Sequence, residues 1–493
     1  MIFVFVLYLA ATMGIAWWYS RGAKTNEEFV IGGKRFGGTA LALSERATGE
    51  SAWLLLGLTG HAYAEGIGAI WVALGCVIGI LFIWQVMAKR LRRETEKTGA
   101  MTVSSLIARK FPGAERNISV LSAVIIIFFF LFYIAAQFSG AGKVLQKTFG
   151  LDPIWGVIIG SVVVITYCMM GGFIAVVVTD VFQAVLMIIT LVAFPIIALF
   201  IAESYNIHII QSIDSAGPAY LSLTEGKTGL AAVLFILSGL SWAFGYTGQP
   251  QLLTRMMAIR NDRDVRTAKW VATTWTIFAY AGAILIGLFG IAFVQHGYLG
   301  HEEAKLAADS EKILPVMVLT LVNPILAGFL LSGVISAMMS TAATELTVSS
   351  SSMGEDIVGK LRRILMNNKQ KLLLNKLLTL AIGIAAFLLA ITLTDTVYSL
   401  VSYAWSGIGS SFGPAMLLIL FWKRISRAGV YASLICGTTG TIIWKNFFEA
   451  DTGVSERLAS FVVAFVMAVL FSLLMPEKKK SEIAKYRNSE IAK

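Results

Sequence analysis

Apolar segments of about bilayer length follow one another along almost the whole chain. Because a membrane-crossing helix needs about 20 consecutive apolar residues, this pattern predicts thirteen spans. They are expected at 1–20, 38–62, 66–89, 118–146, 152–173, 178–202, 229–254, 269–294, 313–350, 377–393, 396–422, 429–448 and 457–475. Of the 493 residues, 57% are hydrophobic and 14% are charged. We therefore predict an all-α integral membrane protein.

The distribution of Lys and Arg predicts the orientation of the chain. With thirteen spans, the termini lie on opposite faces of the membrane. Most of the 40 Lys and Arg residues fall on the cytoplasmic face if the N-terminus is outside, as the positive-inside rule requires. We expect a plasma-membrane protein whose C-terminus is cytoplasmic. The first segment has neither a basic start nor a cleavage site, which favours a retained helix over a signal peptide.

The net charge of +11 follows from short basic segments beside the spans. Examples are "KRLRRETEK" (89–97) and the tail 476–493, so we expect no nucleic-acid partner. The three cysteines lie inside spans without metal-type spacing, and no disulfide framework is indicated. The expected partners are the lipid bilayer and small solutes.

Two predicted spans carry clusters of helix-breaking residues. The second span contains Gly49, Gly57 and Gly60 around several charges, and "LSGLSWAFGYTGQP" (237–250) contains three glycines and Pro250. Breaks at membrane depth occur where backbone is buried in protein or lines a cavity, and they often mark binding sites. The alternative is that such glycines only let helices pack closely.

The two broken spans are five spans apart, which is the spacing of two inverted repeats of five helices. This organisation divides the chain into five parts. They are a leading helix with its loop at 1–37, repeats at 38–202 and 229–422, two further helices at 429–475 and the basic tail at 476–493.

A hydroxyl-bearing face runs along the ninth span. Ser336, Ser340 and Thr344 recur at helical spacing, with Thr341 and Glu345 beside them. Hard oxygen donors facing a bundle interior suit a desolvated alkali cation. Hydroxyls in membrane helices also bond back to their own backbone, and a water-lined channel wall has the same pattern.

At these places the sequence resembles the sodium:solute symporter family, and within it the sodium/proline symporters. The matching segments are "EFVIGGKRFGG" (28–38), "GGFIAVVVTDVFQAVLM" (171–187), "WAFGYTGQP" (242–250) and "SAMMST" (336–341). The resemblance implies a LeuT-type core of five plus five helices in inverted repeats, with one extra helix before it and two after it.

The resemblance also implies functional residues. Sodium would be held by backbone carbonyls of Ala47, Glu50 and Ala337 and by hydroxyls of Ser340 and Thr341. For substrate binding it implies Ser51, Trp53, Tyr133, Trp242, Tyr246 and Pro250. Aromatic faces can pack an apolar ring and attract an ammonium, and free amides at the broken helix can take a carboxylate. Asp180 would lie where sodium leaves, or it caps a helix after Thr179.

The chain departs from the family pattern at the first break. It has "TGESAW" where the proline branch has "SDMSGW", so an acid has become Gly49 and a neutral residue has become Glu50. Glu45 and Arg46 appear one turn earlier, and Glu345 stands where a glutamine is usual. Charges at such depth are costly and are commonly paired or functional.

Three interpretations of these charges remain. Arg46 and Glu50 can neutralise each other at i, i+4 spacing, unless a helix break separates them. Arg46 can instead pair across the bundle with Glu345. In the third, Glu50 or Glu345 replaces the charge lost at Gly49 or carries a coupling proton.

The leading hypothesis is a sodium-coupled symporter that imports a small amino acid, with proline as the first candidate, by alternating access. A proton-coupled or differently specific symporter of the same fold is one alternative. A solute sensor or a channel is the alternative from another class. We expect no enzyme, because the spans contain no paired Asp motif, HExxH or serine with a base. No cofactor besides the coupling Na⁺ is expected.

Overall fold

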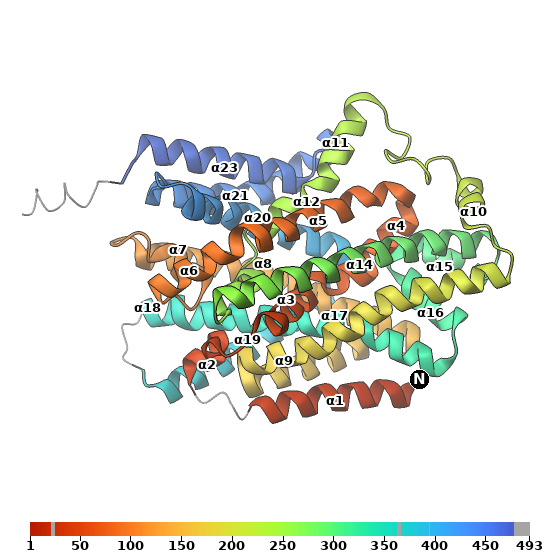
Figure 1. Ribbon diagram of the computed structural model, residues 1–493, viewed down its shortest axis with the longest axis horizontal. Coiled ribbons are helices and arrows are strands. Elements are labelled where there is room, and N and C mark those ends of the chain that lie inside the picture. The colour runs from red at the N-terminus through yellow and green to blue at the C-terminus, as the bar shows by residue number, and fades with distance from the viewer. Residues whose placement is uncertain (21–24, 362–365, 394, 478–493) are drawn as a thin grey trace, which may run out of the picture.

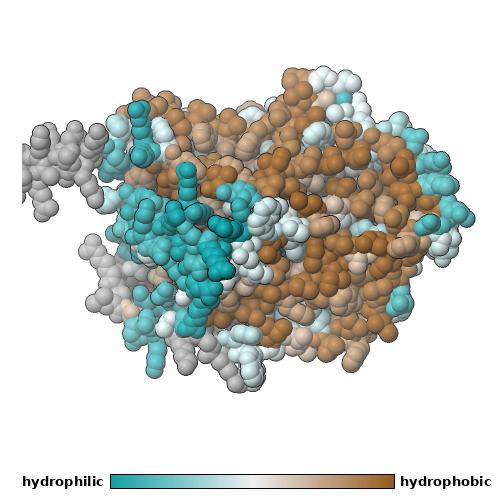
Figure 2. Space-filling view, viewed as in Figure 1, coloured by the Kyte–Doolittle hydropathy of each residue, from teal (hydrophilic) through white to brown (hydrophobic). Residues whose placement is uncertain are grey.

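The computed structural model describes residues 1–20, 25–361, 366–393 and 395–477, and these residues form helices and no strand. The long helices run roughly side by side along the long axis of the molecule (Figure 1). An apolar surface covers the middle, and hydrophilic residues gather at the two ends (Figure 2). This is the surface of a membrane-spanning bundle.

Ten helices in the described ranges are long and apolar enough to cross a membrane. They are Ile2–Ser20, Gly38–Thr98, Glu115–Phe149, Pro153–Ser204, Gly229–Tyr246, Asp262–Gln295, Pro324–Val358, Asn368–Thr392, Val397–Phe421 and Glu456–Leu474. The second and the fourth each exceed 50 residues, which is too long for one crossing, and each contains a break in its backbone.

The run Gly38–Thr98 is built from seven consecutive elements. They are α3 (Gly38–Ala52), the π-helical η2 (Trp53–Leu58), α4 (Thr59–Glu65), the 3₁₀ turn η3 (Gly66–Ala69), α5 (Ile70–Phe82), the π-helical η4 (Ile83–Met87) and α6 (Ala88–Thr98). The chain turns back at η3, so α3 to α4 and α5 to α6 run in opposite directions (Figure 1). Gly66 has φ 69°, a conformation that favours glycine.

The helix α9 (Pro153–Ser204) is interrupted at Gly172, where φ is 53°. On one side of this break, the Tyr167 hydroxyl donates to the Met339 carbonyl (2.7 Å), and on the other, Asp180 accepts from Ser340 (2.7 Å). Tyr167 and Asp180 are 13 positions apart, yet they contact the consecutive residues Met339 and Ser340 of α17 (Pro324–Ser351). The two halves of α9 therefore both pack beside α17.

The remaining helices complete the bundle around α3, α9 and α17. In chain order they are α1 (Ile2–Ser20), α2 (Asn26–Ile31), η1 (Gly32–Lys34), α7 (Val103–Ala108), α8 (Glu115–Phe149), α10 (Ile209–Ala216), α11 (Gly229–Leu240), α12 (Trp242–Tyr246), α13 (Pro250–Ala258), α14 (Asp262–Gln295), η5 (Gly300–Glu302), α15 (Glu303–Ala308), η6 (Ser310–Lys312), α16 (Ile313–Leu321), η7 (Ser352–Val358), α18 (Gly359–Leu361), α19 (Asn368–Thr392), α20 (Val397–Phe421), α21 (Arg427–Phe447), α22 (Glu449–Thr452) and α23 (Glu456–Leu474).

The expected span 313–350 is wrong in its first part. The chain forms the separate helix α16, and α17 begins only at Pro324. The Asn323 side chain caps α17 by accepting from the backbone amides of Ile325 and Leu326, and a proline is well suited to the first helical position. The helix α21, expected as a span at 429–448, is not among the ten described helices that are long and apolar enough to cross a membrane. The N-terminus and the end of α23 lie at opposite ends of the bundle (Figure 1).

The break in α9 yields a stability prediction. A Cβ at Gly172 would lie 2.5 Å from the Phe29 ring, and the backbone conformation there is strained for any other residue. We expect Gly172→Ala to lower the free energy of unfolding by about 2 kcal/mol or more, measured by denaturation of the purified protein in detergent. Gly14→Ala is the matched control, because nothing lies within 4 Å of its Cβ position. Equal stability of the two variants would contradict this account of the turn.

Candidate functional site

The backbone of α3 breaks at Ser51, in the middle of the bundle. Ser51 is fully buried and has φ 51° and ψ −171°, a rare conformation for a residue other than glycine. Its Oγ accepts from the Trp53 amide at 3.0 Å, and the Tyr133 hydroxyl lies 3.5 Å away. Three of the sequence-predicted substrate residues, Ser51, Trp53 and Tyr133, therefore meet at the break.

Neighbouring helices supply hydrogen bonds to the broken segment. The Ala52 amide donates to Gln137 Oε1 of α8 (2.9 Å), and the Thr341 hydroxyl of α17 donates to the Thr48 carbonyl (2.8 Å). The amides of Ala52 and Trp53 both have acceptors, so these two are not free to take the carboxylate of a substrate. Gln137 had no recognisable signal in the sequence.

The unusual charges of α3 form a buried cluster. Arg46 makes ion pairs with both Glu45 and Glu50, and all three side chains are fully buried. Trp84 donates to Glu45 (2.9 Å) and Tyr280 donates to Glu50 (2.5 Å). The Arg46–Glu50 pair predicted at i, i+4 is confirmed. The break follows Glu50 and leaves their helical spacing intact.

Glu345 has a different environment from the other buried acids. Its side chain is fully buried on α17, and neither carboxylate oxygen has a hydrogen-bond partner within the described part of the chain. The predicted pairing of Arg46 with Glu345 is wrong, because the Arg46 guanidinium is bonded to Glu45, Glu50 and Thr276.

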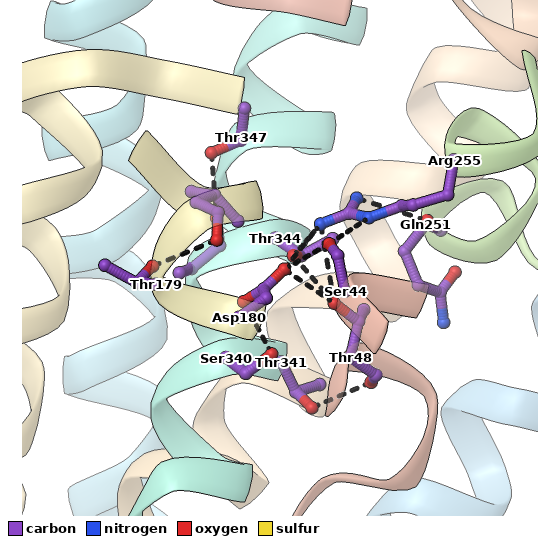
Figure 3. A network of polar contacts seen from close by, with 12 residues as sticks. Ser44, Thr48, Thr179, Asp180, Gln251, Arg255, Ser340, Thr341, Thr344 and Thr347 are labelled. Atoms are coloured by element: carbon purple, nitrogen blue, oxygen red, sulfur yellow. Dashed lines mark hydrogen bonds and ion pairs between the residues drawn. The ribbon is translucent and has the colours of Figure 1, made fainter. Parts of the chain in front are cut away.

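Asp180 joins three further helices to α9 (Figure 3). Its carboxylate accepts from Ser44 (2.6 Å) and Ser340 (2.7 Å) and pairs with Arg255 (3.1 Å). These partners lie on α3, α17 and α13. The helix-capping interpretation of Asp180 is wrong, because the residue lies inside the second half of α9.

Arg255 is the main charged residue that the sequence interpretation missed. Its guanidinium contacts Thr344, lies 3.4 Å from the Thr48 hydroxyl and donates to the Gln251 carbonyl at 3.2 Å (Figure 3). The end of the apolar segment had placed Arg255 beside the membrane. In the structure, Arg255 is buried. The hydroxyl face of α17 predicted the hydroxyl groups of this polar network but not the arginine that they contact.

Oxygen atoms converge where α3, α9 and α17 meet. The hydroxyls of Ser340 and Thr341, the Thr48 carbonyl and the Asp180 carboxylate gather there (Figure 3). Such hard donors suit an alkali cation. Two further residues predicted for sodium, Ala47 and Ala337, are fully buried on α3 and α17, which contact each other.

Aromatic side chains pack on the other side of the break. The ring centroids of Trp53 and Trp242 are 4.3 Å apart, and Tyr246 meets Trp405 at 4.6 Å. The ring centroid of Tyr398 lies 6.2 Å from that of Trp53. The sequence interpretation predicted neither Trp405 nor Tyr398. For Trp405 a signal was present, because "SYAWSGIGSS" (402–411) surrounds it with small residues as the seventh span surrounds Trp242.

Pro250, also predicted for the substrate, is the first residue of α13. It lines a small cavity with Ile126, Thr254 and Val348, between α8, α13 and α17. Gly245 and Gly248, which precede it, pack directly against Trp405 and Gly413. For these two glycines, close packing explains the residue type.

Comparison with known proteins finds relatives over nearly the whole chain. The sequence model of the sodium:solute symporter family matches residues 29–437. The osmoregulated proline transporter OpuE of Bacillus subtilis (strain 168) is 32% identical over 96% of this chain and 95% of its own. The high-affinity proline transporter PutP of the same organism is 34% identical over 90% of both chains. Sodium/proline symporter 2 of Staphylococcus saprophyticus is 31% identical over 96% of this chain and 92% of its own.

Solved structures show the same fold. A substrate-bound, outward-open Na⁺-coupled sialic acid symporter is similar with a TM-score of 0.77 and 18% identity, over 97% of this chain and 98% of that one. MhsT in complex with L-phenylalanine is similar with a TM-score of 0.56 and 14% identity, over 88% of this chain and 97% of that one. The expected LeuT-type architecture is confirmed.

The Asp180–Arg255 pair yields a prediction from its burial. Asp180→Asn leaves the Arg255 charge without its ionic partner, and breaking a buried pair in this way costs about 3–5 kcal/mol. Arg255→Met leaves the carboxylate unpaired. We expect the loss of unfolding free energy in the double variant to be about 1–3 kcal/mol smaller than the sum of the losses in the two single variants. Denaturation of the three variants in detergent measures this difference, and strictly additive losses would show that the pair contributes no interaction.

Proposed function

The chain belongs to the sodium:solute symporter family, and from this premise we propose that it imports proline or a similar small amino acid together with sodium. It is a multi-pass transporter of the plasma membrane and not an enzyme. The observation that carries the proposal is the convergence of oxygen donors beside a helix broken at membrane depth. The proline transporters among its relatives support the choice of substrate.

The proposed sodium site lies between α3 and α17. Its ligands are the backbone carbonyls of Ala47, Glu50 and Ala337 and the hydroxyls of Ser340 and Thr341. Each hydroxyl donates its single hydrogen elsewhere, to Asp180 or to the Thr48 carbonyl, and so keeps its lone pairs available for a cation. Neutral oxygens bind a monovalent ion firmly enough to capture it and loosely enough to release it.

We propose that sodium moves from this site toward Asp180 before it is released. Asp180 bonds Ser340, one of the proposed ligands, and its carboxylate is paired with Arg255. An ion that moves toward Asp180 therefore meets a fixed positive charge. Rearrangement of the Arg255 contacts with Asp180 and Thr344 would accompany its release.

The proposed substrate site lies at and beyond the break. Ser51 and Tyr133 supply hydroxyls, and Trp53, Trp242 and Tyr246 supply apolar faces for a small ring. Pro250 begins the helix that carries Arg255, so its contact with a substrate would connect the substrate to the ion network.

We also propose that the N-terminus is outside and the C-terminus is cytoplasmic. The basic segment of α6 contains Arg90, Arg92, Arg93 and Lys97 at the hydrophilic end shown on the left of Figure 2. The positive-inside rule assigns that end to the cytoplasm.

Removal of both proposed sodium hydroxyls tests the function. Uptake of labelled proline into proteoliposomes should rise with sodium concentration and saturate. In Ser340→Ala/Thr341→Ala, the sodium concentration for half-maximal uptake should rise about tenfold or more, since each lost ligand contributes of the order of 1 kcal/mol.

The control for this variant is Ser336→Ala, one turn earlier on α17. Its hydroxyl bonds back to Ser332 of the same helix, so its sodium dependence should equal that of the wild type. A normal sodium response in the double variant would refute the proposed ligand set.

A further inference from the structure

Several buried polar atoms without partners gather around the break in α3. Both oxygens of Glu345, the side-chain amide nitrogen of Gln137 and the indole nitrogens of Trp53 and Trp242 have no hydrogen-bond partner among the described residues. All four side chains are at most 2% exposed. Because buried polar groups are nearly always hydrogen-bonded, these four residues form a candidate ligand site.

The packing of α8 against α17 places Glu345 beside Tyr133. The two helices contact each other at Gly140 with Met338 and line one cavity at Ile126 with Ser352. Along α8, Tyr133 is midway in sequence between Ile126 and Gly140. Along α17 and η7, Glu345 is midway between Met338 and Ser352, so both residues lie on the faces through which the two helices contact each other. Tyr133 and Glu345 therefore face each other where the two helices pack.

The charge of Glu345 has no ionic partner among the residues that the structure describes. The buried arginines near the break are committed elsewhere, Arg46 to Glu45 and Glu50 and Arg255 to Asp180. On α8, Lys143 pairs with Glu311. An unpaired carboxylate at membrane depth is costly, so a cationic group is the natural complement of Glu345.

Gln137, one helical turn along α8 from Tyr133, offers a hydrogen-bond donor, in contrast to the acceptor oxygens of Glu345. Gln137 Oε1 accepts from the Ala52 amide at 2.9 Å, which leaves its Nε2 as a donor without an acceptor. An unpartnered donor at Gln137 thus lies beside the break at Ala52, and the unpartnered acid Glu345 faces Tyr133, whose hydroxyl lies 3.5 Å from Ser51.

We propose that Glu345 and Gln137 orient a zwitterionic substrate. Glu345 takes the protonated amine, Gln137 Nε2 donates to the carboxylate, and Trp53 and Trp242 cover the apolar ring. This inference rests on the proposed amino-acid transport. It narrows the substrates to amino acids with a protonated amine, against neutral sugars and simple carboxylic acids.

Glu345→Gln tests the amine contact. It keeps the side-chain shape and removes the charge. The measurement is inhibition of sodium-driven uptake of labelled L-proline by unlabelled L-proline and by tetrahydro-2-furoic acid, which has a ring oxygen in place of the amine. The wild type should strongly prefer proline. Because Glu345→Gln restores the residue that is usual in the proline branch, the variant should still take up proline. Its preference for proline over tetrahydro-2-furoic acid should shrink about tenfold or more, as for a lost charge-assisted hydrogen bond.

Glu355→Gln is the matched control for this change. Glu355 lies farther along the same helical run, in η7, where it accepts from Asn26 at 2.7 Å. It should keep the wild-type KM and the wild-type preference. Stabilisation of Glu345→Gln by sodium, measured as a shift in melting temperature, checks that the variant is folded.

Gln137→Glu tests the carboxylate contact independently. The new carboxylate can still accept from Ala52 but repels the carboxylate of the substrate. Its preference should move from proline toward prolinamide, which lacks that charge. A wild-type preference in both Glu345→Gln and Gln137→Glu would overturn the inference.

Two other results would also overturn it. Glu345→Gln could alter only the sodium dependence, which would assign Glu345 to the ion. It could alter only the pH dependence of uptake, which would make Glu345 a proton carrier. Failure of the wild type to take up either proline or a similar small amino acid with sodium would instead refute the proposed function, before any variant is compared.

Discussion

Backbone polar groups at membrane depth must find partners within the protein, and the break at Ser51 depends on this constraint. The Trp53 amide is satisfied by the Ser51 side chain, the Ala52 amide by Gln137 of α8 and the Thr48 carbonyl by Thr341 of α17. The break is thus a junction between three helices. Any movement of α8 or α17 relative to α3 changes the hydrogen bonds on which the broken segment depends.

Buried charges connect this junction to the ion path. Asp180 and Arg255 link α9 to α13, and both contact residues of α3 and α17. A cation held by Ser340 and Thr341 would lie beside the contacts that join these helices. Ion binding therefore changes the relative stability of helix arrangements, which is what a ligand must do to shift a conformational equilibrium. In this account, the same contacts couple sodium to substrate.

Local spacing explains which parts of the site could be predicted from the sequence. The glycine-rich break, the hydroxyl face of α17 and the Arg46–Glu50 pair all depend on residues within a few helical turns of each other. The contacts of Tyr280 with Glu50, Trp84 with Glu45 and Arg255 with Asp180 join distant segments. Spacing along one sequence does not say which helix faces meet, so these contacts were missed, and Arg255 was placed outside the bundle.

The most direct test of sodium-coupled transport uses proteoliposomes with labelled proline at equal concentration on both sides and equal pH. An inward sodium gradient should drive net accumulation of proline, and unlabelled proline should compete where a sugar does not. A proton gradient without sodium should drive none. Accumulation that follows the proton gradient and ignores sodium would contradict the account.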